Sequence, residues 1–138
     1  MRSKVAGLPL EEDEAIVFAD WLRAMHIPHT HVANEVGGST AAAKARAIKA
    51  KKMGQNAGVW DYELFIPVYN AFGDVDVYQE ARVELKRKRG GAVSTAQKEW
   101  GEVYKMAGIP CAICKGADEA IKFVQSVIRE IKGDKDVI

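Results

Sequence analysis

The chain has 138 residues, of which 48% are hydrophobic and 28% are charged. This length and balance exclude two enzymes, a disordered chain and a collagen-like repeat, and predict one domain over residues 1–138 with a core of about residues 10–131. Too few uncharged residues lie between Lys4 and Glu11 for a signal peptide, and the uncharged stretch Leu64–Gly73 is too short to cross a membrane. We therefore expect a cytoplasmic protein with no membrane contact, and with both cysteines reduced.

The net charge of +1 conceals two basic clusters. The first cluster contains no acid and consists of Lys44, Arg46, Lys49, Lys51 and Lys52. Residues 82–89 contain five more basic residues, diluted only by Glu84, and end in a second cluster of Arg87, Lys88 and Arg89. Such clusters are typical of surfaces that follow a phosphate backbone, although a solvated helix and a loop tip explain them equally well.

The first third of the chain predicts a helix, a strand and a second helix. A helix over residues 10–25, preceded by Pro9, is indicated by an apolar stripe of Ala15, Phe18, Ala19 and Leu22. Alternation from His29 to Glu35 predicts a strand. Ser39 is expected to cap the second helix, which should be mostly exposed and positive because its apolar stripe is thin: Ala41, Ala45 and Ile48.

Two runs rich in β-forming residues follow. The run VWDYELFIPV, Val59–Val68, and the run from Tyr78 to Arg87 are separated by a turn over Asn70–Asp76 and are expected to pair as antiparallel strands. Asp74 and Asp76 are expected in a solvated loop.

The last third predicts a helix, a short strand and a final helix. The helix Ser94–Ala107 begins with a sequence typical of a capping box, in which Gln97 occupies the third helical position. A buried strand over Ile109–Cys114 and a helix over Ala117–Ile131 complete the chain. The order of elements predicts an α/β fold in which a mixed β-sheet is flanked by helices.

The most informative segment chemically is Arg82–Arg87, RVELKR. In a strand, Glu84 and Lys86 share one face while Val83 and Leu85 point to the other. Such a pair alone is weak evidence, since surface strands often carry one. Asp61, however, lies at the start of the neighbouring predicted strand, and two carboxylates from adjacent strands are a set that binds one or two Mg²⁺ ions.

In this order, several short motifs resemble the VRR-NUC family, a branch of the PD-(D/E)XK nuclease superfamily. The similarity extends from about Glu11 to Gln125. The matching segments are Glu14, His31–Glu35, Gly58–Asp61, Val83–Lys86, Ser94–Trp100 and Gly116–Ala120. One departure is Trp60, which stands where the family usually has proline.

The resemblance implies a PD-(D/E)XK restriction-endonuclease-like core and a role for each matching residue. Asp61 and Glu84 would bind Mg²⁺ or Mn²⁺ together with the backbone carbonyl of Leu85. Lys86 would orient the attacking water and offset charge on the phosphate. The further catalytic candidates are Glu14, which would reach the metal through water, and Gln97, which could instead serve only the helix cap; Asn34 and Glu35 are auxiliary site residues.

The resemblance also implies an activity and partners. We expect a metal-dependent endonuclease that hydrolyses phosphodiester bonds in branched or structured DNA, with both basic clusters on the DNA backbone. Stand-alone family members are often encoded by phages, which would place the protein in the host cytoplasm, and they resemble Holliday junction resolvases and form homodimers. The alternative is a catalytically inactive nucleic-acid-binding module of the same fold.

Three other patterns give little support for an additional site. Cys111 and Cys114 have C-x-x-C spacing but lie on an apolar strand, so we expect buried structural cysteines rather than a zinc or redox site. His26, His29 and His31 lack further ligands that would complete a compact zinc set. The pair Gly37–Gly38 before a helix is weak evidence for phosphate binding.

Overall fold

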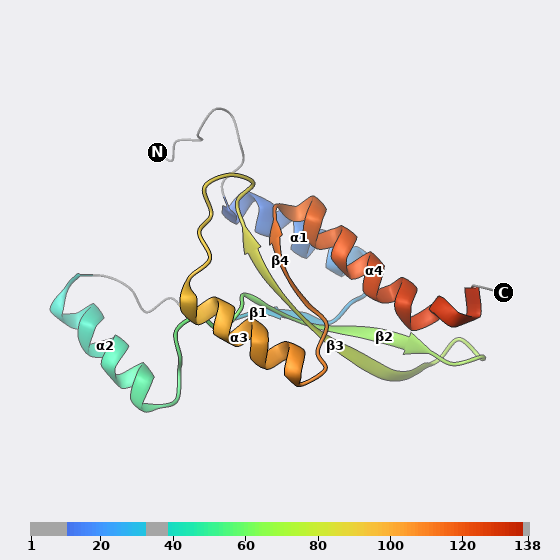
Figure 1. The fold of residues 1–138 in the computed structure, drawn as a ribbon, viewed down its shortest axis with the longest axis horizontal. Helices are drawn as coiled ribbons and strands as arrows, with labels where there is room; N and C mark the ends of the chain where they lie inside the picture. Colours follow the sequence, from blue (N-terminus) through green and yellow to red (C-terminus); the bar gives the residue numbers. More distant parts are fainter. Residues whose placement is uncertain (1–10, 33–38, 137–138) are drawn as a thin grey trace.

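A computed structural model of the protein describes residues 11–32 and 39–136 (Figure 1). Its four-stranded sheet has the order β1 (His29–His31), β2 (Tyr62–Tyr69), β3 (Val75–Lys86) and β4 (Cys111–Lys115). The sheet is mixed, because β2 pairs antiparallel with β1 and β3 whereas β3 pairs parallel with β4. The helices are α1 (Glu11–Ala24), α2 (Ala41–Lys52), α3 (Thr95–Met106) and α4 (Ala117–Asp136). The predicted element order and mixed α/β class are confirmed.

One face of the sheet, the core face, packs against α1 and α4. Period-two alternation directs Leu64, Val83 and Leu85 to this face, and all three are buried. They meet the apolar faces of the two helices, including Phe18, Leu22 and Val124. Phe18 and Tyr62 stack edge to face with their ring centroids 5.1 Å apart.

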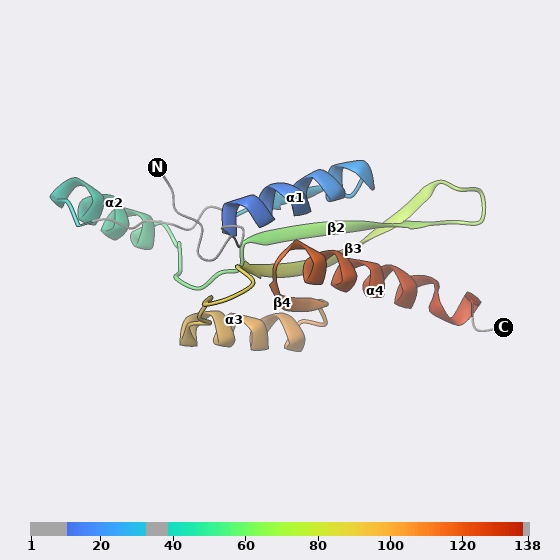
Figure 2. The ribbon, with the colours of Figure 1, turned by 90° about the horizontal axis from the view of Figure 1, so that it is seen from above.

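The opposite face, the site face, is covered in part by α3 (Figure 2). The predicted capping box forms at the start of this helix: Gln97 N donates to Ser94 Oγ and Ser94 N donates to Gln97 Oε1. Tyr104 of α3 is buried beneath the Arg82 guanidinium, whose central carbon lies 5.5 Å from the centre of the tyrosine ring. Because Glu84 and Lys86 are out of phase with Val83 and Leu85, they lie on this site face.

Helix α2 differs in detail from the prediction. Thr40, not Ser39, caps the helix, since its hydroxyl accepts a hydrogen bond from Ala43 N. The predicted stripe through Ile48 is wrong: Ala43 and Ala50 are the buried residues, and Ile48 is 59% exposed. The reason is that α2 stands apart from the sheet (Figure 1), so it is mostly exposed, as predicted.

The hairpin joining β2 and β3 is longer than predicted. β3 begins at Val75, so Asp76 lies in a strand rather than in a loop. The hairpin extends past α1 and α3 (Figures 1 and 2), and its side chains Val77 and Tyr78 are more than half exposed. Strand structure there depends on backbone pairing, which continues to Tyr69 opposite Val75. Because side chains on both faces are exposed, the sequence shows no alternation of buried and exposed residues that would predict the strand.

β2 begins at Tyr62 rather than at Val59, because the backbone from Gly58 to Trp60 turns beneath α3 before the ladder starts. The predicted strand over His29–Glu35 is described only to His31. Asn34, Glu35 and the Gly37–Gly38 pair lie outside the described residues. Over the described part of the chain, no helix has the length and apolar character needed to span a membrane.

Candidate active site

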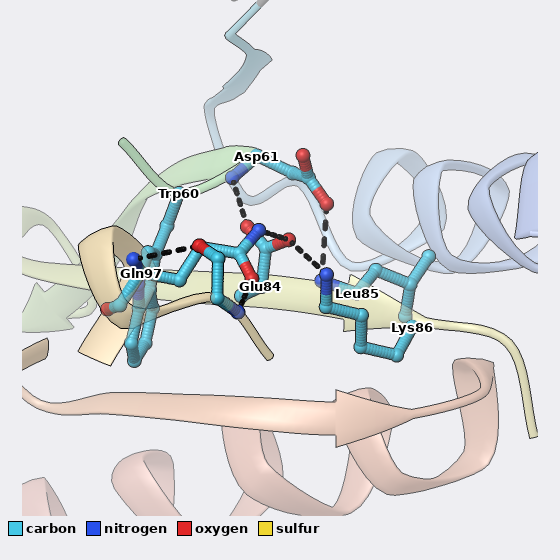
Figure 3. Close-up of polar contacts among 7 residues, drawn as sticks. Trp60, Asp61, Glu84, Leu85, Lys86 and Gln97 are labelled. Carbon is cyan, nitrogen blue, oxygen red and sulfur yellow. Dashed lines mark hydrogen bonds and ion pairs between the residues drawn. The ribbon is translucent and has the colours of Figure 1, made fainter. Parts of the chain in front are cut away.

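Two carboxylates meet on the site face where β2 begins and β3 ends (Figure 3). Asp61 immediately precedes β2, and its neighbour Tyr62 pairs with Val83. Asp61 N donates a 3.1 Å hydrogen bond to Glu84 Oε1, and Leu85 N donates a 3.1 Å hydrogen bond to Asp61 Oδ2. The backbone at Asp61 therefore holds the Glu84 carboxylate, and the backbone of β3 holds the Asp61 carboxylate.

Lys86 belongs to the same cluster. Its Nζ lies 3.2 Å from Glu84 Oε2, and the Lys86 and Glu84 side chains are only 12% and 4% exposed. A pair on an exposed strand would be worth little, but this one is shielded from water, so removing one partner leaves the other charge uncompensated. The structure thus brings together the three side chains that the sequence analysis selected.

Burial perturbs the acidity of Glu84. The pKa of this carboxyl rises to about 7, first because burial disfavours its charged form and second because the negative charge of Asp61 is close. Lys86 opposes the shift through its positive charge and its hydrogen bond. Raised pKa values of this origin are characteristic of functional sites, and a cation placed between the carboxylates would favour the charged form.

Gln97 links α3 to the cluster. Its Nε2 donates a 2.7 Å hydrogen bond to Glu84 Oε2, while its Oε1 accepts the capping hydrogen bond from Ser94 N. The sequence analysis treated the helix cap and the site as alternatives for this residue. The structure shows that one amide group makes both contacts, because its donor and acceptor ends point in different directions.

Trp60 connects the site to the body of α3, a role that the sequence analysis did not assign. The residue is 3% exposed. Its indole Nε1 donates a 2.8 Å hydrogen bond to Gln97 O, and its backbone N donates to Tyr104 Oη at 3.3 Å. The Trp60 and Tyr104 rings also stack edge to face at 5.1 Å.

Two glycines permit this approach of Trp60 and α3. A Cβ on Gly101 would lie 2.9 Å from the Trp60 ring. Gly58 has a φ of +86°, and a Cβ there would lie 2.6 Å from Ala96. The sequence feature that could have indicated this role of Trp60 is its departure from the family's proline, since proline has no backbone N–H to donate to Tyr104.

The donor set fits a hard divalent cation. Asp61 and Glu84 supply carboxylate oxygens side by side, and Mg²⁺ is usually held by one or two carboxylates plus water and phosphate oxygens. Among residues 11–32 and 39–136, no three His, Cys, Asp or Glu side chains form a group able to hold a metal. Two carboxylates leave the other ligand positions of such a cation to water and substrate oxygens, whereas a structural zinc ion takes four protein ligands.

Glu14, the remaining catalytic candidate, lies outside this cluster. The buried Glu14 carboxylate accepts a 2.7 Å hydrogen bond from Ala117 N, so it caps the start of α4. It lies near Gly116, whose N donates to Lys86 O, and therefore near the same end of β3. Its role toward a metal stays a prediction.

The two basic clusters occupy different places. Lys44, Arg46, Lys49, Lys51 and Lys52 are all exposed on α2. Lys88 and Arg89 are exposed directly after β3, whereas Arg87 is half-buried. The second cluster therefore begins one residue beyond Lys86, which makes it the cluster adjoining the carboxylates along the chain.

The cysteines and histidines have structural surroundings. Cys114 is buried in the core, where burial raises its pKa to about 12, and Cys111 lies on the other face against Gly101. Their side chains point to opposite faces of β4, which excludes a shared metal or disulfide in this conformation. His29 Nδ1 lies 2.8 Å from Ile27 O, and His31 stacks on Tyr62.

The mixed sheet has helices on both faces, and an aspartate and an E-x-K pair meet where adjacent strands begin and end, which is consistent with the expected PD-(D/E)XK-like fold. A solved structure described as "VRR_NUC domain protein" shares this fold, with a TM-score of 0.58 and 24% sequence identity over 86% of this chain and 87% of that chain. The VRR-NUC resemblance of the sequence is thus confirmed at the level of the fold. No family model and no curated protein matches the sequence.

Proposed function

We propose that the protein is a metal-dependent endonuclease that hydrolyses phosphodiester bonds in branched or structured DNA. The observation that carries this proposal is the buried meeting of Asp61, Glu84 and Lys86 on the site face. The fold shared with a protein described as a VRR_NUC domain protein supports it.

The proposed chemistry assigns a task to each side chain. Mg²⁺ or Mn²⁺, held by Asp61, Glu84 and the Leu85 carbonyl, would lower the pKa of a bound water and offset charge on the leaving oxygen. Lys86 presents its ammonium group beside Glu84, where it orients the attacking water and stabilises charge that develops on the phosphate. Gln97 holds Glu84 in one orientation through its 2.7 Å hydrogen bond.

The basic clusters would bind the DNA backbone. Helix α2 carries Lys44, Arg46, Lys49, Lys51 and Lys52 with no acid among them, and Lys88 and Arg89 are exposed near the site. Contacts of this kind read no bases, so affinity should fall steeply with salt concentration. A homodimer, also part of this proposal, would place two such sites on the two strands of a branched DNA.

The test is cleavage of labelled four-way junction, flap and linear duplex DNA with Mg²⁺, with Mn²⁺ and with EDTA. We expect cutting only with metal, and a loss of at least about 100-fold in Glu84→Gln and Lys86→Ala, because the first removes a proposed metal ligand and the second removes a positive charge at the reacting phosphate. Glu80→Gln is the control, since Glu80 lies on the same strand but pairs with Arg82.

Three outcomes decide the proposal. Cutting that survives both site substitutions would come from a contaminant or another site, and would contradict the assignment. Binding without any cutting would favour the inactive binding module. The molecular mass in solution, free and with junction DNA, tests the homodimer separately.

A further inference from the structure

A groove of about 650 Å³ lies between α2 and α3 on the outer side of the site. Its walls are mostly small apolar side chains, with Ala47 on α2 facing Ala96 and Trp100 on α3. Lys51, Gln55 and Asn56 supply polar groups at the end of α2 and in the segment after it. Its volume lies in the range of pockets that hold small organic ligands, about 300–1,000 Å³.

Two residues that line the groove lie close along the chain to residues of the candidate active site. Ala96 lines the groove, and the next residue, Gln97, donates to Glu84. Ala57 also lines it and lies four residues before Asp61 on the same connecting segment. The groove therefore lies on elements that also carry the site, within reach of a nucleic acid strand bound at Asp61 and Glu84.

The groove has the chemistry of a nucleobase site. Trp100 provides an aromatic surface, and stacking on such a surface is the usual means of binding unpaired bases. The Gln55 and Asn56 amides each offer donors and an acceptor to the edge of a base. Lys51, with the other basic residues of α2, attracts the attached phosphate. Glu99 also lines the groove, and its negative charge favours a base over a phosphate inside it.

We infer that this groove binds an unpaired nucleobase of the DNA next to the scissile phosphate, stacked on Trp100. This inference rests on the proposed function and deepens it. A paired base is excluded because its edge and both faces are occupied within the duplex, so the groove selects DNA with unpaired nucleotides beside the cleavage point. A single-strand–duplex boundary supplies such nucleotides.

The test is binding in EDTA, so that it does not depend on cleavage. Fluorescein-labelled pentathymidylate is compared with a pentamer of abasic sugar-phosphate units, which has the same charge and no bases. We expect the pentathymidylate to bind about tenfold more tightly, as stacking of one base on an aromatic ring provides. The Trp100→Ala variant should lose this difference, and Trp100→Phe should retain most of it.

A matched pair of substitutions in α2 tests the groove itself. Ala47→Phe fills the groove, whereas Ala42→Phe adds the same ring to the same helix at an exposed position outside it. We expect Ala47→Phe to abolish the preference for bases and Ala42→Phe to leave it unchanged. Thermal unfolding of each variant verifies that it is folded. If Trp100→Ala does not fold, the base preference of Ala47→Phe alone tests whether the groove binds a base.

Two results would overturn the inference. Equal binding of the base-containing and abasic pentamers, in the native protein, excludes a base subsite. Self-association that Ala47→Phe removes, with no effect on the oligonucleotides, identifies the occupant as another copy, for instance its hairpin tip with the 90% exposed Phe72. A native protein that prefers the base-containing pentamer but cuts no DNA would contradict the proposed function alone. A native protein that cuts DNA but shows no preference for bases would contradict this inference alone.

Discussion

The amide of Gln97 donates a 2.7 Å hydrogen bond to the carboxylate of Glu84, thirteen residues earlier in the chain. The other end of the same amide closes the capping box of α3 with Ser94. The start of this helix and the orientation of a buried carboxylate are thus coupled through one side chain. Four predictions follow from this arrangement and its surroundings.

Replacing Gln97 with Glu separates its two contacts. Glutamate also suits the third helical position of a capping box, so α3 should keep its start. The donor to Glu84 is lost, and a second carboxylate is placed against the first. We expect a reduction of metal-dependent cleavage by at least about tenfold, because the charge near the reacting centre is altered. Ser94→Ala is the control: it should cost about 1 kcal/mol of stability without lowering cleavage. Equal cleavage by Gln97→Glu and the native protein would contradict the coupling.

Replacing Trp60 with Phe retains a ring against Tyr104 but removes the indole donor to Gln97 O. We expect a loss of about 1 kcal/mol in the free energy of unfolding, the value of one hydrogen bond, plus the cost of a smaller ring. Urea denaturation measures it. The indole N–H signal that is missing from the NMR spectrum of this variant is assigned to Trp60. In the native protein this signal should shift when Mg²⁺ is added. An unchanged signal would show that the Trp60 indole does not sense metal binding at the site.

Replacing Gly58 with Ala tests the close approach of α3 and the segment that precedes β2. The positive φ of Gly58 disfavours any side chain, and a Cβ there would lie 2.6 Å from Ala96. We expect a destabilisation of about 3 kcal/mol, from backbone strain and overpacking together. Gly108→Ala is matched to it, because Gly108 has a φ of +75° but open space around it, and it should cost only about 1 kcal/mol. Similar melting temperatures for the two variants would exclude the packing contribution.

The raised pKa of Glu84 predicts a pH-dependent stability in EDTA. The pKa is about 7 in the folded protein against the ordinary 4.5 of a glutamate side chain, so folding favours the neutral carboxyl. The stabilisation is complete below pH 4.5 and is lost as the pH rises to about 7, on the order of 3 kcal/mol in total. The stability of the native protein minus that of Glu84→Gln should therefore fall across this range. A difference that rises with pH would show that the carboxylate is stabilised by its partners instead. If the two carboxylates bind metal, Mg²⁺ should restore stability above pH 7.

Local patterns in the sequence carried much of the fold and part of the site. Periodicity places Phe18 and Leu22 in the core and separates Glu84 and Lys86 from Val83 and Leu85, because these relations depend only on the repeat of a helix or a strand. The cap at Ser94 and Gln97 is equally local. Such patterns did not predict the buried face of α2 or the start of β3, because residues such as Ile48 and Val77 are exposed and their hydrophobicity does not indicate burial.

The tertiary structure alone decided how the site is enclosed. Only folding brings Trp60 to Tyr104, 44 residues later, and Glu14 to Ala117, 103 residues later. The burial that raises the pKa of Glu84 also arises from segments that are remote along the chain, since α3 closes over the site face. The sequence by itself determined which side chains share a face of a strand. Contacts between distant segments determined which of those side chains lost their water, because desolvation depends on everything packed around a group and not on its neighbours in the chain.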